Sequence, residues 1–221
     1  MERSRHRAIV PIGLGAILLC LLGTLLVGSI QKQPCAEGDW SDGRQYRWWC
    51  YTDVVPLFGT EQLAGGRLPF LDACAPAEGR NCDEYPVLTM YFMRAAASLS
   101  GADVARFLLA NEVLLGICAA AVALCLYLLV GGRRALYFAL APTLLWASFL
   151  NWDLLAVALA TGALLAFLNR RDGWAGVLLG LGAAAKLYPA LFVVPFVAHR
   201  LREREPDRAI GLAWASVGTW A

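Results

Sequence analysis

The chain has 221 residues, of which 59% are hydrophobic and only 16% are charged. Soluble globular domains contain about 45–50% apolar and about 25% charged residues, so this composition excludes an ordinary soluble domain. The net charge of +2 also excludes the strongly basic class of nucleic-acid-binding proteins.

Long apolar runs with almost no charge dominate the chain, as in residues 8–30 and 113–130. About 20 consecutive apolar residues cross a bilayer core of roughly 30 Å. Inside lipid each backbone polar group needs an internal partner, which a helix supplies. The alternative, a soluble helical bundle, requires a polar face on each helix, and these runs have none. The sequence therefore predicts an all-α, polytopic transmembrane fold.

Positive charges between the apolar runs set the predicted orientation. The run at about 8–30 is longer than the apolar region of a signal peptide, and no small-residue cleavage site follows it, which favours a retained anchor. Basic clusters stay in the cytoplasm. We therefore expect residues 1–30 to form the cytoplasmic tip and first helix, 31–103 an extracytoplasmic loop and 104–221 a transmembrane bundle. The basic clusters are Arg3, Arg5 and Arg7; Arg133 and Arg134; Arg170 and Arg171; and Arg200, Arg202 and Arg204.

Four of the seven cysteines fall in the predicted outer loop. An oxidising compartment favours disulfides, so two bridges are expected, with three pairings open. A zinc site is a weak alternative because the loop has neither a CxxC pair nor a histidine, and no metal is predicted. The other three cysteines lie in apolar helices and are expected to pack as small side chains. The loop cysteines are Cys35, Cys50, Cys74 and Cys82; the others are Cys20, Cys118 and Cys125.

Two loop segments, 53–64 and 85–99, are moderately apolar but interrupted by polar residues. They are predicted to be helices that lie at the membrane surface. Membrane spans are then predicted at about 104–130, 135–150 and 154–169.

Residues 174–199 have two interpretations. As one crossing helix, they would leave the basic cluster that follows on the outer side. As two helices of about 12 residues, each would be about 18 Å long and too short to cross. Pro189 favours the second interpretation, a re-entrant pair, because proline interrupts a helix. A further apolar segment begins near Ala209 and is too short to span, so the chain is expected to be the N-terminal portion of a longer protein.

Several polar residues lie where burial in the membrane costs free energy, or where their side chains could take part in a reaction. Lys186 is the only charge between Trp174 and Val197, and an intramembrane charge is a candidate functional group; a lysine that snorkels to the interface is the alternative. Asp53 opens the first surface helix, where capping is the alternative role. Capping is also the alternative for Asp83 and Glu84 before the second surface helix, and for Asn151 and Asp153 at an outer helix end. Arg67 and Arg94 could bind a phosphate or a lipid headgroup, or be solvated.

Histidine chemistry is not expected on the outer face. His6 and His199, the two histidines, both flank basic segments that are predicted to be cytoplasmic. The common nucleotide-binding, zinc-protease and serine-hydrolase motifs are also missing from the sequence.

The order of several short motifs resembles glycosyltransferase family 87, whose members are polytopic enzymes of the C-type glycosyltransferase (GT-C) fold. The similarity runs from about 50 to 200, and the glycine-rich segment that ends in Lys-Leu-Tyr-Pro is its most specific part. The motifs are YTDVVPL at 51–57, LPF at 68–70, EYPVL at 84–88, NWDLL at 151–155 and GVLLGLGAAAKLYP at 176–189.

The resemblance implies an inverting membrane glycosyltransferase that moves a hexose or pentose, mannose first, from a polyprenyl-phosphate donor to a lipid-linked or cell-envelope glycan. No separate cofactor is then needed, and the active face of the multi-pass cell-membrane protein is extracytoplasmic. Asp53 takes the position of the family's essential aspartate, so it is expected to be the general base. Substrate binding is expected from Arg67, Asp83, Glu84, Tyr85, Asn151, Asp153, Lys186 and Tyr188.

Two other functions remain open at this point. A transporter or flippase for a lipid-linked sugar would favour paired repeats, and no inverted repeat is seen in the sequence. A non-catalytic envelope assembly protein would be expected to lack the aspartate, which is present as Asp53. The identity of the sugar and of the acceptor also stays open.

Overall fold

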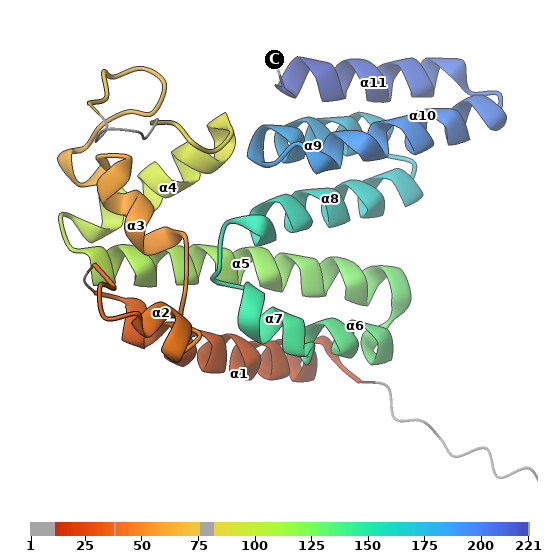
Figure 1. Ribbon diagram of the computed structural model, residues 1–221. Coiled ribbons are helices and arrows are strands. Elements are labelled where there is room, and N and C mark those ends of the chain that lie inside the picture. The colour runs from red at the N-terminus through yellow and green to blue at the C-terminus, as the bar shows by residue number, and fades with distance from the viewer. Residues whose placement is uncertain (1–11, 38, 76–81, 221) are drawn as a thin grey trace, which may run out of the picture.

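The computed structural model describes residues 12–37, 39–75 and 82–220, and all regular elements within them are helices (Figure 1). The all-α prediction is thus confirmed for the described part of the chain. The α-helices are α1 (Leu14–Lys32), α2 (Arg44–Arg47), α3 (Val54–Thr60), α4 (Val87–Ser100), α5 (Val104–Val130), α6 (Gly132–Ala139), α7 (Pro142–Ala147), α8 (Asp153–Leu168), α9 (Asp172–Ala185), α10 (Val193–Arg202) and α11 (Pro206–Trp220). The short 3₁₀ helices are η1 (Gln33–Cys35), η2 (Leu63–Gly65) and η3 (Tyr188–Phe192).

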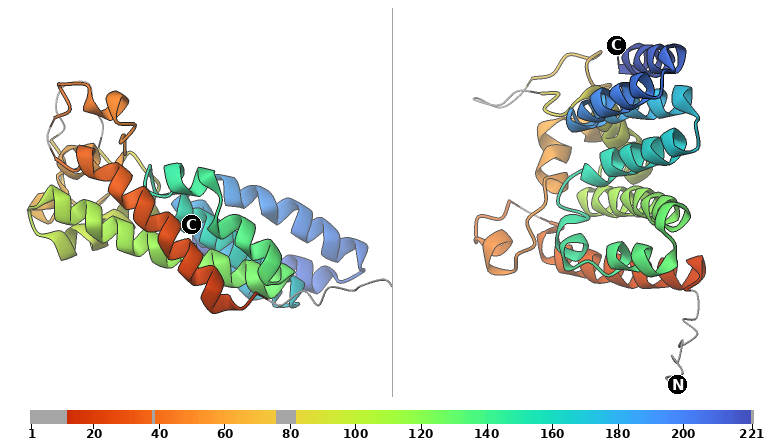
Figure 2. Two further views of the ribbon diagram at one scale, coloured as in Figure 1. Left: turned by 90° about the horizontal axis from the view of Figure 1, so that it is seen from below. Right: turned by 90° about the vertical axis from the view of Figure 1, so that its right-hand side faces the viewer.

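The long helices stack beside one another in chain order: α1 contacts α5, α5 contacts α8, α8 contacts α9 and α9 contacts α11 (Figures 1 and 2). Within the described residues, α1 with η1 and α5 are the two helices long and apolar enough to cross a membrane. Large apolar side chains on their outer faces, such as Leu19 and Ile117, remain exposed. Exposed apolar surface of this extent suits lipid better than water. The helix predicted at 8–30 begins, in the described residues, at Leu14.

The single span predicted at 135–150 is wrong. The chain forms two short helices there, α6 and α7, and they are separated at Leu140 and Ala141. Ala141 is extended, with φ −64° and ψ 124°, because the ring of Pro142 disfavours helical geometry in the residue before it. The predictions at 104–130 and 154–169 correspond closely to α5 and α8.

The break predicted around Lys186 is confirmed. α9 ends at Ala185, and Lys186 is extended with φ −157° and ψ 138°. The chain then reverses through η3 into α10 (Figure 1). Arg200 near the end of α10 donates through Nε to Asp172 at the start of α9, at 2.7 Å. The two halves of this segment therefore return to the same end of the bundle, as the re-entrant interpretation requires.

The basic segments gather at one end of the stack and the disulfide-bearing loop lies at the other (Figure 1). The start of α1 lies against the start of α6, where the backbone of Ile12 closely approaches Gly132. At the same end Arg208 pairs with Asp172 at 2.8 Å, and Arg170 pairs with Glu205. Arg3, Arg5 and Arg7 lie outside the described residues. This grouping matches the charge asymmetry on which the predicted orientation was based.

The predicted outer loop packs over the N-terminal end of α5. The ring of Phe58 in α3 stacks on Phe107 of α5 with centroids 4.5 Å apart, and α4 packs along the same helix. The segment predicted at 53–64 becomes α3 and η2, and the segment at 85–99 becomes α4.

Two disulfides form in this loop, Cys35–Cys50 and Cys74–Cys82, which decides among the three possible pairings. Cys20, Cys118 and Cys125 are free and half-buried, as predicted for packing residues.

Candidate active site

Asp53 immediately precedes α3, but its carboxylate does not cap that helix. The backbone is held instead by the segment before α8: the Asp53 N–H donates to the Leu150 carbonyl at 2.8 Å, and Thr52 Oγ1 donates to the Phe149 carbonyl at 2.7 Å. The capping role considered for Asp53 is therefore wrong. The carboxylate is left available for other partners.

Two phenols bind the Asp53 carboxylate. Tyr51 donates to Oδ1 at 2.8 Å and Tyr85 donates to Oδ2 at 2.9 Å. The hydrogen bond to Asp53 raises the pKa of Tyr51 to about 12, and burial together with the same kind of bond raises the pKa of Tyr85. Both phenols therefore remain protonated donors at neutral pH. An ionised carboxylate accepts at about four lone-pair positions, so Asp53 keeps capacity for a further hydroxyl donor.

Lys186 is not the unpaired cation that the sequence suggested. It lies in the break after α9, and its Nζ bonds Oδ1 of Asp153 in the first turn of α8. The two side chains are 35% and 49% exposed, so an anionic ligand can reach them. Asn151 Oδ1 accepts from the Asp153 N–H at 2.9 Å and so orders the turn before α8, whose N-cap position is Trp152 and which has no side-chain cap.

Aromatic and backbone contacts bring Asp53 and the Lys186–Asp153 pair to the same region. The Tyr85 ring meets Trp152 edge-on, with centroids 5.1 Å apart, and Trp152 is the neighbour of Asp153 in the chain. Thr89 in α4 donates to the carbonyl of Ala185 at 2.7 Å, which ties α4 to the end of α9. The site therefore lies where the starts of α3, α4 and α8 meet the end of α9.

Tyr188 begins η3, which packs against α8, the helix that starts at Asp153. The structure thus brings together Asp53, Tyr85, Asp153, Lys186 and Tyr188 among the predicted site residues. Sequence reasoning missed Thr52, Thr89 and Trp152 as supports, and it did not single out Tyr51 as a partner of Asp53. The available signal was their place in the quoted motifs: Tyr51, Thr52 and Trp152 lie within them, and Thr89 directly follows one.

Arg67 and Asp83 form an ion pair with each other and do not line an open site. Arg67 Nη2 lies 2.7 Å from Asp83 Oδ2, and its Nη1 lies 3.6 Å from a carboxylate oxygen of the buried Glu61. Glu61 also accepts from the backbone N–H of Asp83 at 2.7 Å and of Glu84 at 3.1 Å. The cluster fixes the approach to α4, so the phosphate-binding role considered for Arg67 is not supported by its position.

The side chain of Glu84 is exposed, and the capping role considered for Asp83 and Glu84 is wrong because Pro86 precedes α4 without a side-chain cap. Arg94 is half-buried and extends toward Gly66. Glu61 was read in the sequence only as an interruption of an apolar segment, and nothing in the local pattern marked it as the centre of a cluster.

An apolar groove of about 480 Å³ lies between α1 and α5. Its polar members are Ser29 and the buried Glu112, which share a hydrogen bond of 2.7 Å from Ser29 Oγ to Glu112 Oε2. Phe149 also lines the groove, and its carbonyl is the one that holds Thr52 beside Asp53. The groove therefore lies next to the segment that carries the candidate base.

Comparison with known proteins bears on this arrangement. The model of glycosyltransferase family 87 matches residues 85–221, a range that contains Tyr85, Asp153, Lys186 and Tyr188 and begins after Asp53. No curated protein and no solved structure matches the chain. Among the described residues, no group of three histidine, cysteine or acidic side chains is arranged to hold a metal ion. The family match covers more than half of the sequence and agrees with the membrane-type helices, so the chain is a membrane glycosyltransferase that belongs to glycosyltransferase family 87.

Proposed function

We propose that the protein is an inverting transferase that moves a sugar, mannose first, from a polyprenyl-phosphate donor to a lipid-linked or cell-envelope glycan. The reaction takes place at the extracytoplasmic face of the cell membrane, and the chain crosses that membrane several times in a GT-C-type fold. The observation that carries the proposal is the Asp53 carboxylate, which two phenols hold near the exposed Lys186–Asp153 pair.

Asp53 acts as the general base in this scheme. The acceptor hydroxyl oxygen attacks the anomeric carbon of the donor sugar and forms the new glycosidic bond. The bond from that carbon to the phosphate oxygen breaks, and its electron pair leaves with the lipid phosphate. The hydroxyl proton passes to Asp53. Positioned proton transfer of this kind typically accelerates a reaction by about 10²–10⁴-fold.

Lys186 takes the leaving phosphate. Its present partner, Asp153, is half-exposed, and a phosphate with more than one negative charge competes well for the same ammonium. Positive charge placed where negative charge develops stabilises the transition state. Asp153 then becomes free to accept hydrogen bonds from sugar hydroxyls.

The lipid character of the donor is supported by the groove between α1 and α5. Its lining is almost entirely leucine and other apolar side chains, and it reaches the segment that holds Thr52. A donor of this class carries its own leaving group, so the scheme needs neither a nucleotide site nor a separate cofactor.

The decisive experiment supplies membranes that contain the protein with radiolabelled polyprenyl-phosphate mannose or polyprenyl-phosphate arabinose. We expect the label of one donor to appear in a glycolipid or glycan product, and Asp53→Asn membranes to lack that product. Movement of intact donor across the bilayer without transfer would instead support a transporter. Absence of both, with the protein inserted and its disulfides formed, would support a non-catalytic assembly role.

A further inference from the structure

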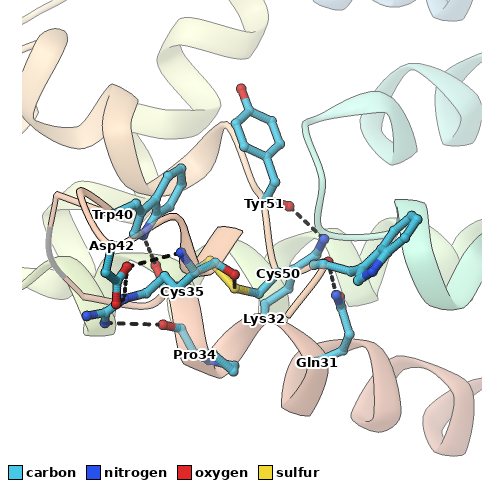
Figure 3. Close-up of a disulfide and its surroundings, with 10 residues drawn as sticks. Gln31, Lys32, Pro34, Cys35, Trp40, Asp42, Cys50 and Tyr51 are labelled. Atoms are coloured by element: carbon cyan, nitrogen blue, oxygen red, sulfur yellow. Dashed lines mark hydrogen bonds and ion pairs between the residues drawn. A yellow bond between two sulfur atoms is a disulfide. The ribbon is translucent and has the colours of Figure 1, made fainter. Parts of the chain in front are cut away.

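Lys32, the last residue of α1, is a buried lysine in an unusual setting. It is only 2% exposed, although a lysine at a helix end can usually extend its ammonium into water. Its Nζ donates to the carbonyl oxygen of Tyr51 at 2.7 Å (Figure 3). Within the described part of the chain it forms no ion pair. Burial of a charge without a direct counterion costs free energy, so Lys32 is a candidate for a functional role.

The Cys35–Cys50 disulfide fixes the place of this contact. Cys35 follows Lys32 by three residues and Cys50 directly precedes Tyr51, and both cysteines are fully buried (Figure 3). The disulfide therefore joins the segment after α1 covalently to the segment that leads into Asp53. The Lys32–Tyr51 contact is held between covalently joined segments, so it is a built feature of the loop.

The contact leads directly to the candidate base. Lys32 binds the backbone of Tyr51, and the phenol of the same tyrosine donates to Asp53 Oδ1 at 2.8 Å. The ammonium thus supports the backbone of the tyrosine whose phenol holds the carboxylate.

We propose that Lys32 is a positioning residue for Asp53: it holds the backbone of Tyr51 so that the phenol stays in hydrogen-bonding distance of the carboxylate. The inference rests on the proposed function, in which Asp53 removes the proton of the acceptor hydroxyl. Lys32 itself touches neither substrate.

The test compares the rate and the donor KM of sugar transfer by the full chain in membranes. Lys32→Gln keeps a donor for the Tyr51 carbonyl, and Lys32→Met removes it. We expect Lys32→Met to lower kcat by about 10-fold, the order expected for the loss of one hydrogen bond from a charged group, and Lys32→Gln to lower it less. Lys32→Arg should restore most of the wild-type rate. Donor KM should change less than about twofold, since Lys32 does not touch the donor.

Arg106→Met is the charge control, because Arg106 lies in the first turn of α5 and its side chain is 76% exposed. Its rate should match wild type. Thiol labelling of Cys35 and Cys50 checks that each variant folds. If Lys32→Gln and Lys32→Met lower the rate equally, or if only the folded fraction falls, Lys32 is a structural residue and the inference fails.

The proposed function is tested separately in the same assay. An active Asp53→Asn enzyme would remove the role of Asp53 and with it the basis for the inference. An inactive Asp53→Asn enzyme together with wild-type rates for the folded Lys32 variants would leave the role of Asp53 in place and overturn only the role of Lys32.

Discussion

The two ends of the helical stack both contain charged side chains, but these are arranged in opposite ways. At the basic end, the guanidinium of Arg200 is only 3% exposed and binds Asp172 at 2.7 Å, Glu203 at 2.6 Å and the Phe167 carbonyl at 2.7 Å. It also lies over the Phe167 ring, 4.2 Å from the centroid. At the other end, Asp53, Asp153 and Lys186 have few partners and are partly open.

This difference distinguishes charged residues that stabilise the fold from charged residues that are available for a reaction. A charge whose hydrogen-bonding positions are filled by the protein stabilises the fold and has little left to offer a ligand. Arg200 joins the start of α9 to the end of α10 in this way. A charge with unused positions, such as the Asp53 carboxylate, can exchange or add partners during a reaction. The same reasoning moves Arg67 from the predicted binding residues to the structural ones, because Asp83 and Glu61 engage it.

The largest expected effect is on Asp53. Asp53→Asn keeps the size of the side chain and removes its basicity, so transfer should fall by about 10²–10⁴-fold while membrane insertion stays normal. Asp83→Asn and Glu84→Gln should be milder. Product formation per inserted molecule, from labelled donor, is the measurement. Near-normal turnover in Asp53→Asn together with collapse in Glu84→Gln would transfer the role of base to Glu84.

At the opposite end, Arg200→Met should destabilise the protein without touching the chemistry. Removal of one partner from a buried ion pair costs about 3–5 kcal/mol, because Asp172 is left buried with less compensation. Thermal unfolding in detergent measures the loss, and transfer per folded molecule should stay at the wild-type rate. The exposed Arg202, two residues along the same helix, supplies the control variant Arg202→Met. Equal stability of the two variants would contradict the contrast between the ends.

A smaller effect is expected at Lys186, which belongs to the open set. Lys186→Met removes the proposed phosphate ligand, and hydrogen bonds to charged groups contribute about 1.5–3 kcal/mol. Donor affinity should therefore weaken by about 10- to 100-fold, which corresponds to that free energy. Binding of polyprenyl-phosphate sugar to purified protein measures it, and unfolding temperature is the control. Unchanged affinity in a well-folded variant would mean that Lys186 serves only to hold Asp153.

The smallest effect concerns Tyr51 at alkaline pH. Its pKa is raised to about 12, from an ordinary value near 10. The bond to Asp53 is therefore at full strength below about pH 10 and is lost only as pH rises through about 12. The ultraviolet titration of phenol groups, compared between wild type and Tyr51→Phe, should show no difference up to about pH 10. A tyrosine that ionises near its ordinary value in that difference spectrum would show that the bond is not maintained.

Local pattern in the sequence was enough for the all-α fold, the two longest helices, the break at Lys186 and the presence of loop disulfides. Apolar run length and proline act over a few residues, so neighbours along the chain determine them. The motif order was also enough to identify the family. The single span at 135–150 was wrong because the run was judged by hydropathy alone, although Pro142 breaks it in the middle.

Only the tertiary structure decided which polar groups meet. Asp53 and Tyr85 are separated by 32 residues, Asp153 and Lys186 by 33, and Lys32 and Tyr51 by 19. A partner at such a distance leaves no trace in local periodicity, because it depends on how the helices stack and how the loop folds over α5. The same holds for the pairing of Cys35 with Cys50. Residue types could therefore nominate Asp53 and Lys186, whereas the three-dimensional packing determined that Lys186 is paired, that Arg67 is held by two carboxylates and that Lys32 binds the backbone of Tyr51.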